Sequence, residues 1–140
     1  MKINYALLAD LAQATPDGKV NILGGGIDQL MAPEFPIVQP VLTLVARIEV
    51  AASECDKDHR FQVLFWDQDG NQLPPTVDGH FTAQRNPVNP AGISNIQLAI
   101  MMSQVAIPRA GDYSFRIMLD DREEANLPLL VRSSPQRASA

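Results

Sequence analysis

The most regular feature of this chain is an alternation of apolar and polar residues with a period of two. It is clearest over residues 111–121, where the sequence reads GDYSFRIMLDD. Successive side chains of a β-strand point to opposite sides, so the alternation predicts a strand with one buried and one solvated face. The residues predicted to face the core are Tyr113, Phe115, Ile117 and Leu119. The residues predicted to face water are Ser114, Arg116, Met118 and Asp120.

Similar patterns predict further strands along the whole chain. These strands cover residues 20–31, 41–50, 59–67, 76–84, 94–105 and 125–132. Residues 3–15 fit both a helical stripe and a strand face, but the turn sequence PDGK that follows them favours a strand that forms a hairpin with residues 20–31. Three glycines at positions 24–26 predict a bulge or a sharp bend. Three prolines make residues 32–40 an extended connection between two sheets.

These elements predict an all-β fold, an antiparallel β-sandwich of about eight strands with an immunoglobulin-like or jelly-roll-like arrangement. At 140 residues, with 46% hydrophobic and 19% charged residues, the chain has the size and composition of one globular domain. We expect that domain to span residues 1–132. Residues 133–140 are small and polar, and we expect them to form a flexible C-terminal tail.

Four segments carry a pattern that extends beyond fold class: ALLAD near the start, KVNILGGGID across the first turn, then SNIQLAI and AGDYSFRIMLDD. Together they resemble a family of small, uncharacterised bacterial proteins over roughly residues 5–131. The resemblance implies a β-sandwich, and it brings no known activity and no functional residue with it. Family members often carry Asp-Gly, which favours a type I′ hairpin, where this chain has Asp120-Asp121.

Charge and cysteine content limit the functions and the compartment. With a net charge of −5 the chain lacks the basic surface that binds nucleic acid. No apolar run approaches the roughly 20 residues of a membrane helix, so we expect no membrane association. The single cysteine, Cys55, cannot form an internal disulfide, which predicts a soluble protein in the reducing cytoplasm. Residues 2–14 loosely resemble a signal peptide, but Asn4 and Asp10 interrupt the apolar core that export requires.

Oxygen-bearing side chains recur in two acidic segments. Asp67, Asp69 and Asn71 have the first three spacings of a calcium loop, but Gly70 is misplaced and the twelfth position is Asp78 rather than glutamate. A plain turn is therefore the favoured interpretation. The only metal-ligand candidates are these three residues together with Asp120 and Asp121. The two histidines, His59 and His80, have no spaced partners for zinc, and we expect no cofactor.

The sequence also lacks a recognisable catalytic motif. Glycines 24–26 are not followed by a helix that could hold a phosphate, and no nucleophile elbow is present. Cys55 lies between Glu54 and Asp56, whose negative charges disfavour a thiolate. We therefore predict a non-enzymatic binding or structural module. The alternative is a carbohydrate- or small-ligand-binding domain, or a hydrolase that uses the carboxylates of residues 120–124 at a loop end.

One predicted sheet face has the composition of an interface. The residues on the solvent side of the strand over residues 94–105 carry no charge; they are Asn95, Gln97, Ala99, Met101 and Ser103. If the strand over residues 111–119 pairs with it, Met118 joins the same face. Methionine packs adaptably, and uncharged apolar patches mark contact surfaces. We predict that Gln97, Ala99, Met101 and Met118 contact a second copy or an unidentified protein partner, unless the N-terminal segment or the tail covers this face.

Overall fold

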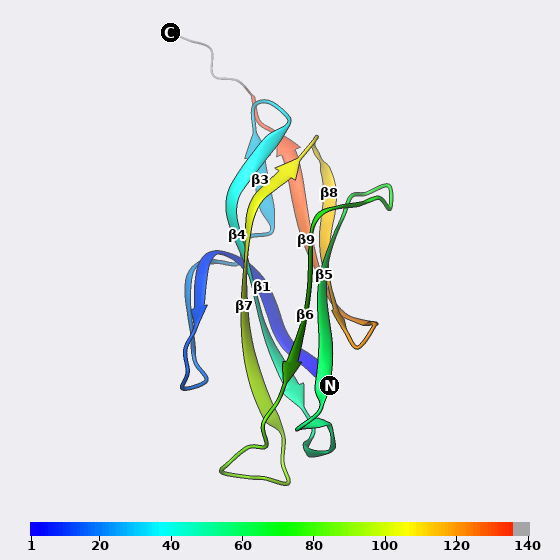
Figure 1. The fold of residues 1–140 in the computed structure, drawn as a ribbon. Coiled ribbons are helices and arrows are strands. Elements are labelled where there is room, and N and C mark those ends of the chain that lie inside the picture. Colours follow the sequence, from blue (N-terminus) through cyan, green and yellow to red (C-terminus); the bar gives the residue numbers. More distant parts are fainter. Residues whose placement is uncertain (136–140) are drawn as a thin grey trace.

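The computed structural model describes residues 1–135 and shows a sandwich of two packed β-sheets (Figure 1). The strands are β1 (Lys2–Ala14), β2 (Val20–Gly25), β3 (Gln29–Ala32), β4 (Ile37–Val50), β5 (Asp58–Trp66), β6 (Gln72–Thr82), β7 (Ser94–Ile107), β8 (Gly111–Leu119) and β9 (Arg122–Ser133). A short 3₁₀ turn, η1 (Ala52–Glu54), lies between β4 and β5. The predicted all-β sandwich is confirmed, and the segment that fitted both a helix and a strand forms β1, Lys2–Ala14.

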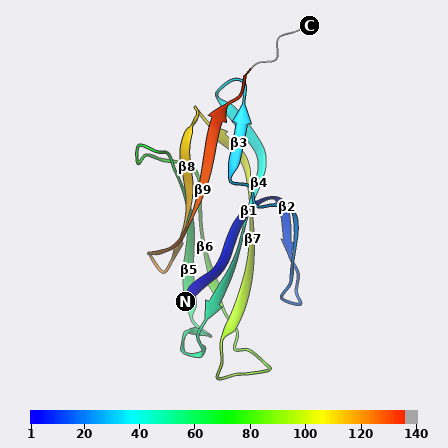
Figure 2. The same ribbon diagram turned by 180° about the vertical axis from the view of Figure 1, so that it is seen from behind.

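The strand order is β2-β1-β4-β7 in one sheet and β3-β9-β8-β5-β6 in the other (Figure 2). Within the described part of the chain, β3 and β9 form the one parallel pair, and the other paired strands are antiparallel. No helix in residues 1–135 is long and apolar enough to cross a membrane.

The glycine run divides the predicted second strand into β2 and β3, which belong to different sheets. Gly24 and Gly26 have φ values of +62° and +92°, in the left-handed region that glycine adopts without a steric cost. The backbone N–H groups of Gly26 and Ile27 donate to the Leu8 carbonyl at 2.8 and 3.0 Å. The bend predicted from three glycines is therefore present, and the division it makes explains why there are nine strands rather than eight.

The core between the sheets is built around β5 and β8, which lie side by side. The predicted inward row of β8, Tyr113, Phe115, Ile117 and Leu119, is buried. The Phe115 ring stacks on the Phe65 ring at a centroid distance of 4.5 Å, and the Tyr113 ring also stacks on Phe65, at 5.4 Å. The Tyr113 hydroxyl donates to the Arg109 carbonyl at 2.7 Å, the tyrosine corner common in β-sandwiches.

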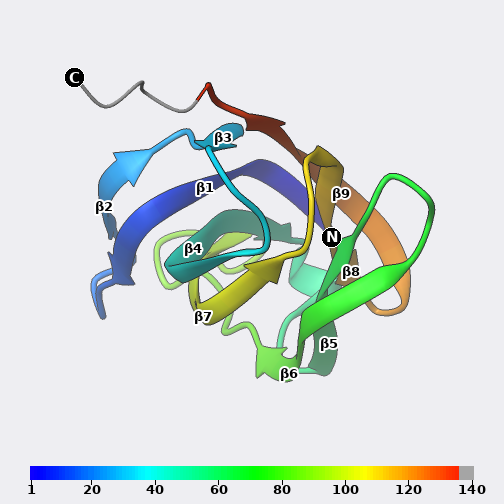
Figure 3. The ribbon, with the colours of Figure 1, turned by 90° about the horizontal axis from the view of Figure 1, so that it is seen from above.

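The strand pairing predicted for the interface is wrong. β7 pairs with β4, whereas β8 lies between β5 and β9 in the other sheet (Figure 3). Gln104 has a φ of +56°, and beyond this irregularity Val105 and Ile107 are buried. The chain then crosses between the sheets through residues 108–110. The short connection after β7 is thus a crossover and not a hairpin, so Met118 does not share a sheet with Met101.

A two-residue turn joins β8 to β9 even though it contains no glycine. Leu119 pairs with Arg122, and the two turn residues, Asp120 and Asp121, have φ values of +46° and +65°. Positive φ at both positions is the type I′ geometry. The Asp120 carboxylate accepts hydrogen bonds from the backbone of Arg60 at 2.9 Å and from His59, and these contacts hold the turn in place of glycine.

The C-terminal end of the domain extends slightly into the predicted tail. Ser133 is the last residue of β9, and the N–H of Ser134 donates to the Ala32 carbonyl at 2.9 Å. Residues 136–140 of the predicted tail lie outside the described residues.

Candidate functional site

The outer side of the four-stranded sheet carries an exposed group of residues without charge. Met101 of β7 pairs with Thr43 of β4, which pairs with Ala9 of β1. Because side chains two residues apart in a strand share a face, Leu11 lies on the same side as Ala9, and Leu11 in turn pairs with Leu23 of β2. We call this set the uncharged face, which consists of Leu11, Leu23, Gln97, Ala99 and Met101.

The largest side chains of the uncharged face are open to solvent. The exposed fraction is 64% for Met101, 66% for Leu23 and 47% for Leu11. Gln97 is half-buried and accepts a hydrogen bond from the Tyr5 hydroxyl at 2.6 Å, and Arg47, its pairing partner in β4, borders the face. Thr43 and Ala9, which lie between Met101 and Leu11, are buried. Met101 on one side and the pair Leu11 and Leu23 on the other are therefore exposed at separate places on this side of the sheet.

Part of the uncharged face lies on a hairpin that projects from the sandwich. β1 pairs with β4 as far as Ala9 and continues beyond it paired with β2 alone. We call residues 10–25 the hairpin arm, drawn in blue in Figures 1 and 2. An open hollow of about 500 Å³ runs along it, and the residues that line the hollow are all uncharged: Leu11, Ala12, Gln13, Asn21, Ile22 and Leu23.

The acidic turn between β5 and β6 is saturated by donors from the chain itself. The Asp67 carboxylate accepts the backbone N–H groups of Asp69 and Asn71, both at 2.9 Å, and the Asn71 side-chain amide at 3.1 Å. The hydrogen bond from the Asn71 backbone is the main cause that lowers the pKa of Asp67. Arg109 donates to Asp69 at 2.7 Å. These contacts are those of a structural turn.

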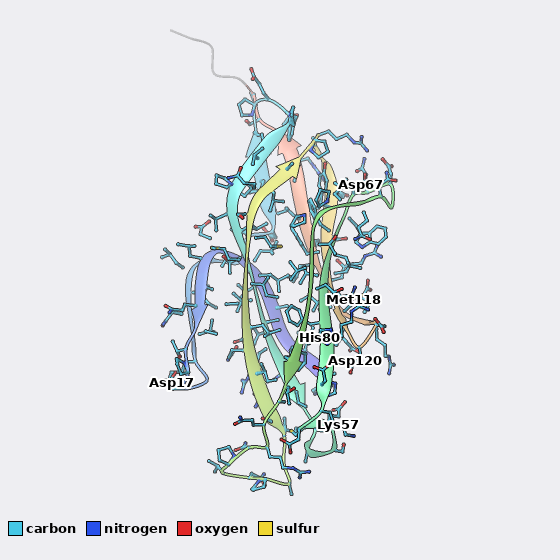
Figure 4. All side chains as sticks on the ribbon, in the orientation of Figure 1. Asp17, Lys57, Asp67, His80, Met118 and Asp120 are labelled. Atoms are coloured by element: carbon cyan, nitrogen blue, oxygen red, sulfur yellow. The ribbon has the colours of Figure 1, made fainter. Side chains whose placement is uncertain are left out.

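The two acidic turns lie apart, so the five candidate ligands named from the sequence do not form one group. Asp67 follows β5, whereas Asp120 contacts the residues at the start of β5, and the two lie at opposite ends of the five-stranded sheet in Figure 4. Asp121 forms an ion pair with Arg60 at 3.0 Å. No group of three or more acidic, histidine or cysteine side chains within residues 1–135 is arranged to hold a metal ion.

Comparison with known proteins supports the resemblance seen in the sequence. A family model described as "Family of unknown function (DUF6941)" matches residues 4–132. The chain belongs to this family. No curated protein matches it. The match extends from β1 to β9, so in this DUF6941 member the family region and the β-sandwich coincide.

The two histidines and the cysteine of this DUF6941 protein lie in structural contacts. The ring nitrogens of His59 contact Asp120 Oδ2 at 2.7 Å and the Glu54 carbonyl at 2.6 Å. A carbonyl can only accept, so Nε2 donates to it, and neither nitrogen is free to take a proton from a substrate. His80 is exposed and pairs with Asp58 at 2.9 Å. Cys55 is buried.

These contacts also determine the charge of His59. Burial of the ring lowers its pKa, but the hydrogen bonds to the Glu54 carbonyl and to Asp120 outweigh burial, and the pKa of His59 is raised above its ordinary value. The pKa of Asp120 is lowered, first by the backbone hydrogen bond from Arg60 and then by His59. Both shifts favour the charged forms of the two side chains, and their contact ties β5 to the β8–β9 turn.

The sequence identified only part of the uncharged face in this DUF6941 member. Gln97, Ala99 and Met101 lie on the outer side of the four-stranded sheet as expected from the alternation in β7. Met118 is half-buried in the other sheet. Leu11 and Leu23 were missed because an alternating pattern does not reveal that the hairpin arm leaves the sandwich. A usable signal was the absence of charge over residues 11–14 and 20–27, on both sides of a charged turn.

Proposed function

We propose that this DUF6941 protein is a non-enzymatic module that binds a protein through the uncharged face and acts in the cytoplasm. The observation that carries the proposal is the exposure of Leu11, Leu23 and Met101 on one side of the same sheet. Large apolar side chains left in water are unfavourable, and on folded domains exposed apolar patches mark sites of contact. Methionine adapts its shape to a partner without needing a charged group there.

The rest of the surface favours this face over the loop ends. Three of the carboxylates that a loop-end hydrolase would use are already paired: Asp120 with His59 and the Arg60 backbone, Asp121 with Arg60, and Glu123 with Arg116. The small-ligand alternative has no comparable supporting feature, and a thermal-shift screen with sugars, nucleotides and divalent ions tests it, because a specific ligand raises the melting temperature. The unpaired, buried Cys55 agrees with a reducing compartment.

A matched pair of substitutions tests the proposal. Met101 and Met31 have nearly equal exposed fractions, 64% and 66%, and both lie on edge strands, but of different sheets. Wild type, Met101→Asp and Met31→Asp carry the same affinity tag and are purified from the native host, and the proteins retained on each are quantified. We expect Met101→Asp alone to lose the retained partner while its melting curve stays cooperative. Equal retention by all three proteins would contradict the proposal.

A further inference from the structure

The two sheets end in four edge strands, and the way each is protected differs. β6 contains Pro74 and Pro75, which cannot donate to another strand, and β3 is only four residues long. β2 has six residues and ends in two glycines. Prolines, short length and irregularity are the usual devices that prevent an edge from pairing with another chain.

β7 has none of this protection over most of its length. It spans 14 residues, Ser94–Ile107, and contains no proline and no charged residue. Its one irregularity is Gln104, close to its end. One side of β7 pairs with β4 from Ser94 to Ile107, and no strand in residues 1–135 is hydrogen-bonded along its other side. A long, uncharged edge of this kind is a template for another strand.

We propose that β7 pairs antiparallel with β7 of a second copy across a two-fold axis, which joins the two four-stranded sheets into one sheet of eight strands. The inference rests on the proposed function, since it names the partner of the uncharged face. A two-fold contact uses the same edge on both copies and is complete with two chains, so assembly stops at a dimer. The combined face then extends across the axis from one Met101 to the other.

The absence of charge on β7 makes this edge the place where a second copy meets the least repulsion. Each chain has a net charge of −5, so two copies repel one another at most points of their surfaces. β7 brings no charge to the contact, and the repulsion is smallest there. A partner selected by opposite charge would find no charged side chain on β7 with which to pair.

The composition of β7 also suits pairing with itself. In an antiparallel two-fold pair with Ala99 at the axis, Gln97 faces Met101 and Asn95 faces Ser103 of the other copy. Every such pair joins uncharged side chains on the same outer side. Residues 94–104 of the two strands lie opposite one another, and residues 105–107 extend beyond the paired region. Side chains directly opposite each other in neighbouring strands are the pairs that stabilise a sheet, whereas like charges at these positions destabilise it.

Substitutions that add a charge at the two-fold axis of the full chain test whether β7 pairs with β7 of a second copy. The variants Ala99→Lys and Ala99→Asp place like charges opposite one another at the axis of the proposed pair, because Ala99 of one copy faces Ala99 of the other. Light scattering should give twice the 15.3 kDa chain mass for wild type and the single-chain mass for each variant alone. An equimolar mixture of the two variants should regain the dimer mass, because lysine then faces aspartate. That recovery also shows that both variants are folded.

The control variant changes the edge strand of the other sheet, which the proposed dimer does not use. Met31→Lys, on the edge strand of the other sheet, should remain a dimer. Wild type at the single-chain mass at every concentration would overturn the second-copy inference, as would variants that stay dimeric alone. In either case the loss of a host protein from Met101→Asp but not from Met31→Asp would leave the proposed function standing with a different partner, so the two failures are distinguishable.

Discussion

Truncation of Phe115 should be among the most destabilising single changes in this fold. Its side chain is fully buried, with 0% exposed, and its ring stacks on Phe65 at 4.5 Å with an interplanar angle of 17°. Replacing a buried phenylalanine with alanine costs about 3–5 kcal/mol through lost transfer free energy and the cavity left behind. A domain of this length has a stability of roughly 7–20 kcal/mol, so the loss is a large fraction of the total.

The assay is urea denaturation followed by circular dichroism, with Arg116→Ala as the neighbouring control. The sequence places Arg116 in water, which predicts an effect within about 0.5 kcal/mol. In the structure its guanidinium lies 4.8 Å from the centroid of the Trp66 ring, and this contact raises the expected cost to about 0.5–1 kcal/mol. The loss of unfolding free energy in Phe115→Ala should be several times the loss in Arg116→Ala, and equal losses would refute the assigned alternation in β8.

Three further predictions concern the polar contacts. Because the pKa of His59 is raised, its pairing with Asp120 contributes stability that is fully present below the unfolded pKa of about 6.5 and is lost as pH rises through the folded pKa. Urea unfolding of the wild type from pH 5 to 9 should show this loss of stability. The same loss in His59→Gln would contradict the assignment to His59. Adding calcium, zinc or a chelator should leave the melting temperature unchanged, and a calcium-induced rise that Asp69→Ala removes would overturn the structural interpretation of that turn. Tyr113→Phe should cost about 1 kcal/mol because the hydrogen bond to the Arg109 carbonyl is lost, and an unchanged urea midpoint would show that the tyrosine corner contributes nothing.

The parts of the fold that depend on local chemistry could be predicted from the sequence. The alternation in β8 identified its buried row because one side of a strand must pack and the other must be solvated. The glycines at 24–26 identified the bend because few other residues adopt positive φ without strain. Both signals lie within a few residues, and no knowledge of distant contacts is needed to interpret them.

Pairing between distant strands could not be predicted in this way. A short connection between β7 and β8 can close a hairpin or cross to the other sheet, and the alternation of the two strands is the same in both cases. β7 changes its buried side at Gln104, which has a positive φ. Glutamine is not a residue type that predicts such an irregularity. Of the two methionines predicted to share an interface, Met101 therefore lies on the expected face and Met118 lies in the other sheet.

The candidate site combines one predictable part with one that depends on the whole fold. The absence of charge along β7 could be read directly from Gln97, Ala99 and Met101. The exposure of Leu11 and Leu23 depends on where β1 separates from β4. This point comes after Ala9, and it is a property of strand pairing between distant segments. Likewise, the pairing of His59 with Asp120 joins residues 61 positions apart, and no local pattern connects them.

The native mass of the tagged protein in extract from its own host, measured by size-exclusion chromatography with light scattering, shows whether the uncharged face is an interface. Wild type and Met31→Asp should elute in an assembly larger than the 15.3 kDa chain, and Met101→Asp should elute at the mass of the single chain. Wild type at the single-chain mass, or Met101→Asp in the same assembly as wild type, would contradict the claim that the uncharged face is an interface.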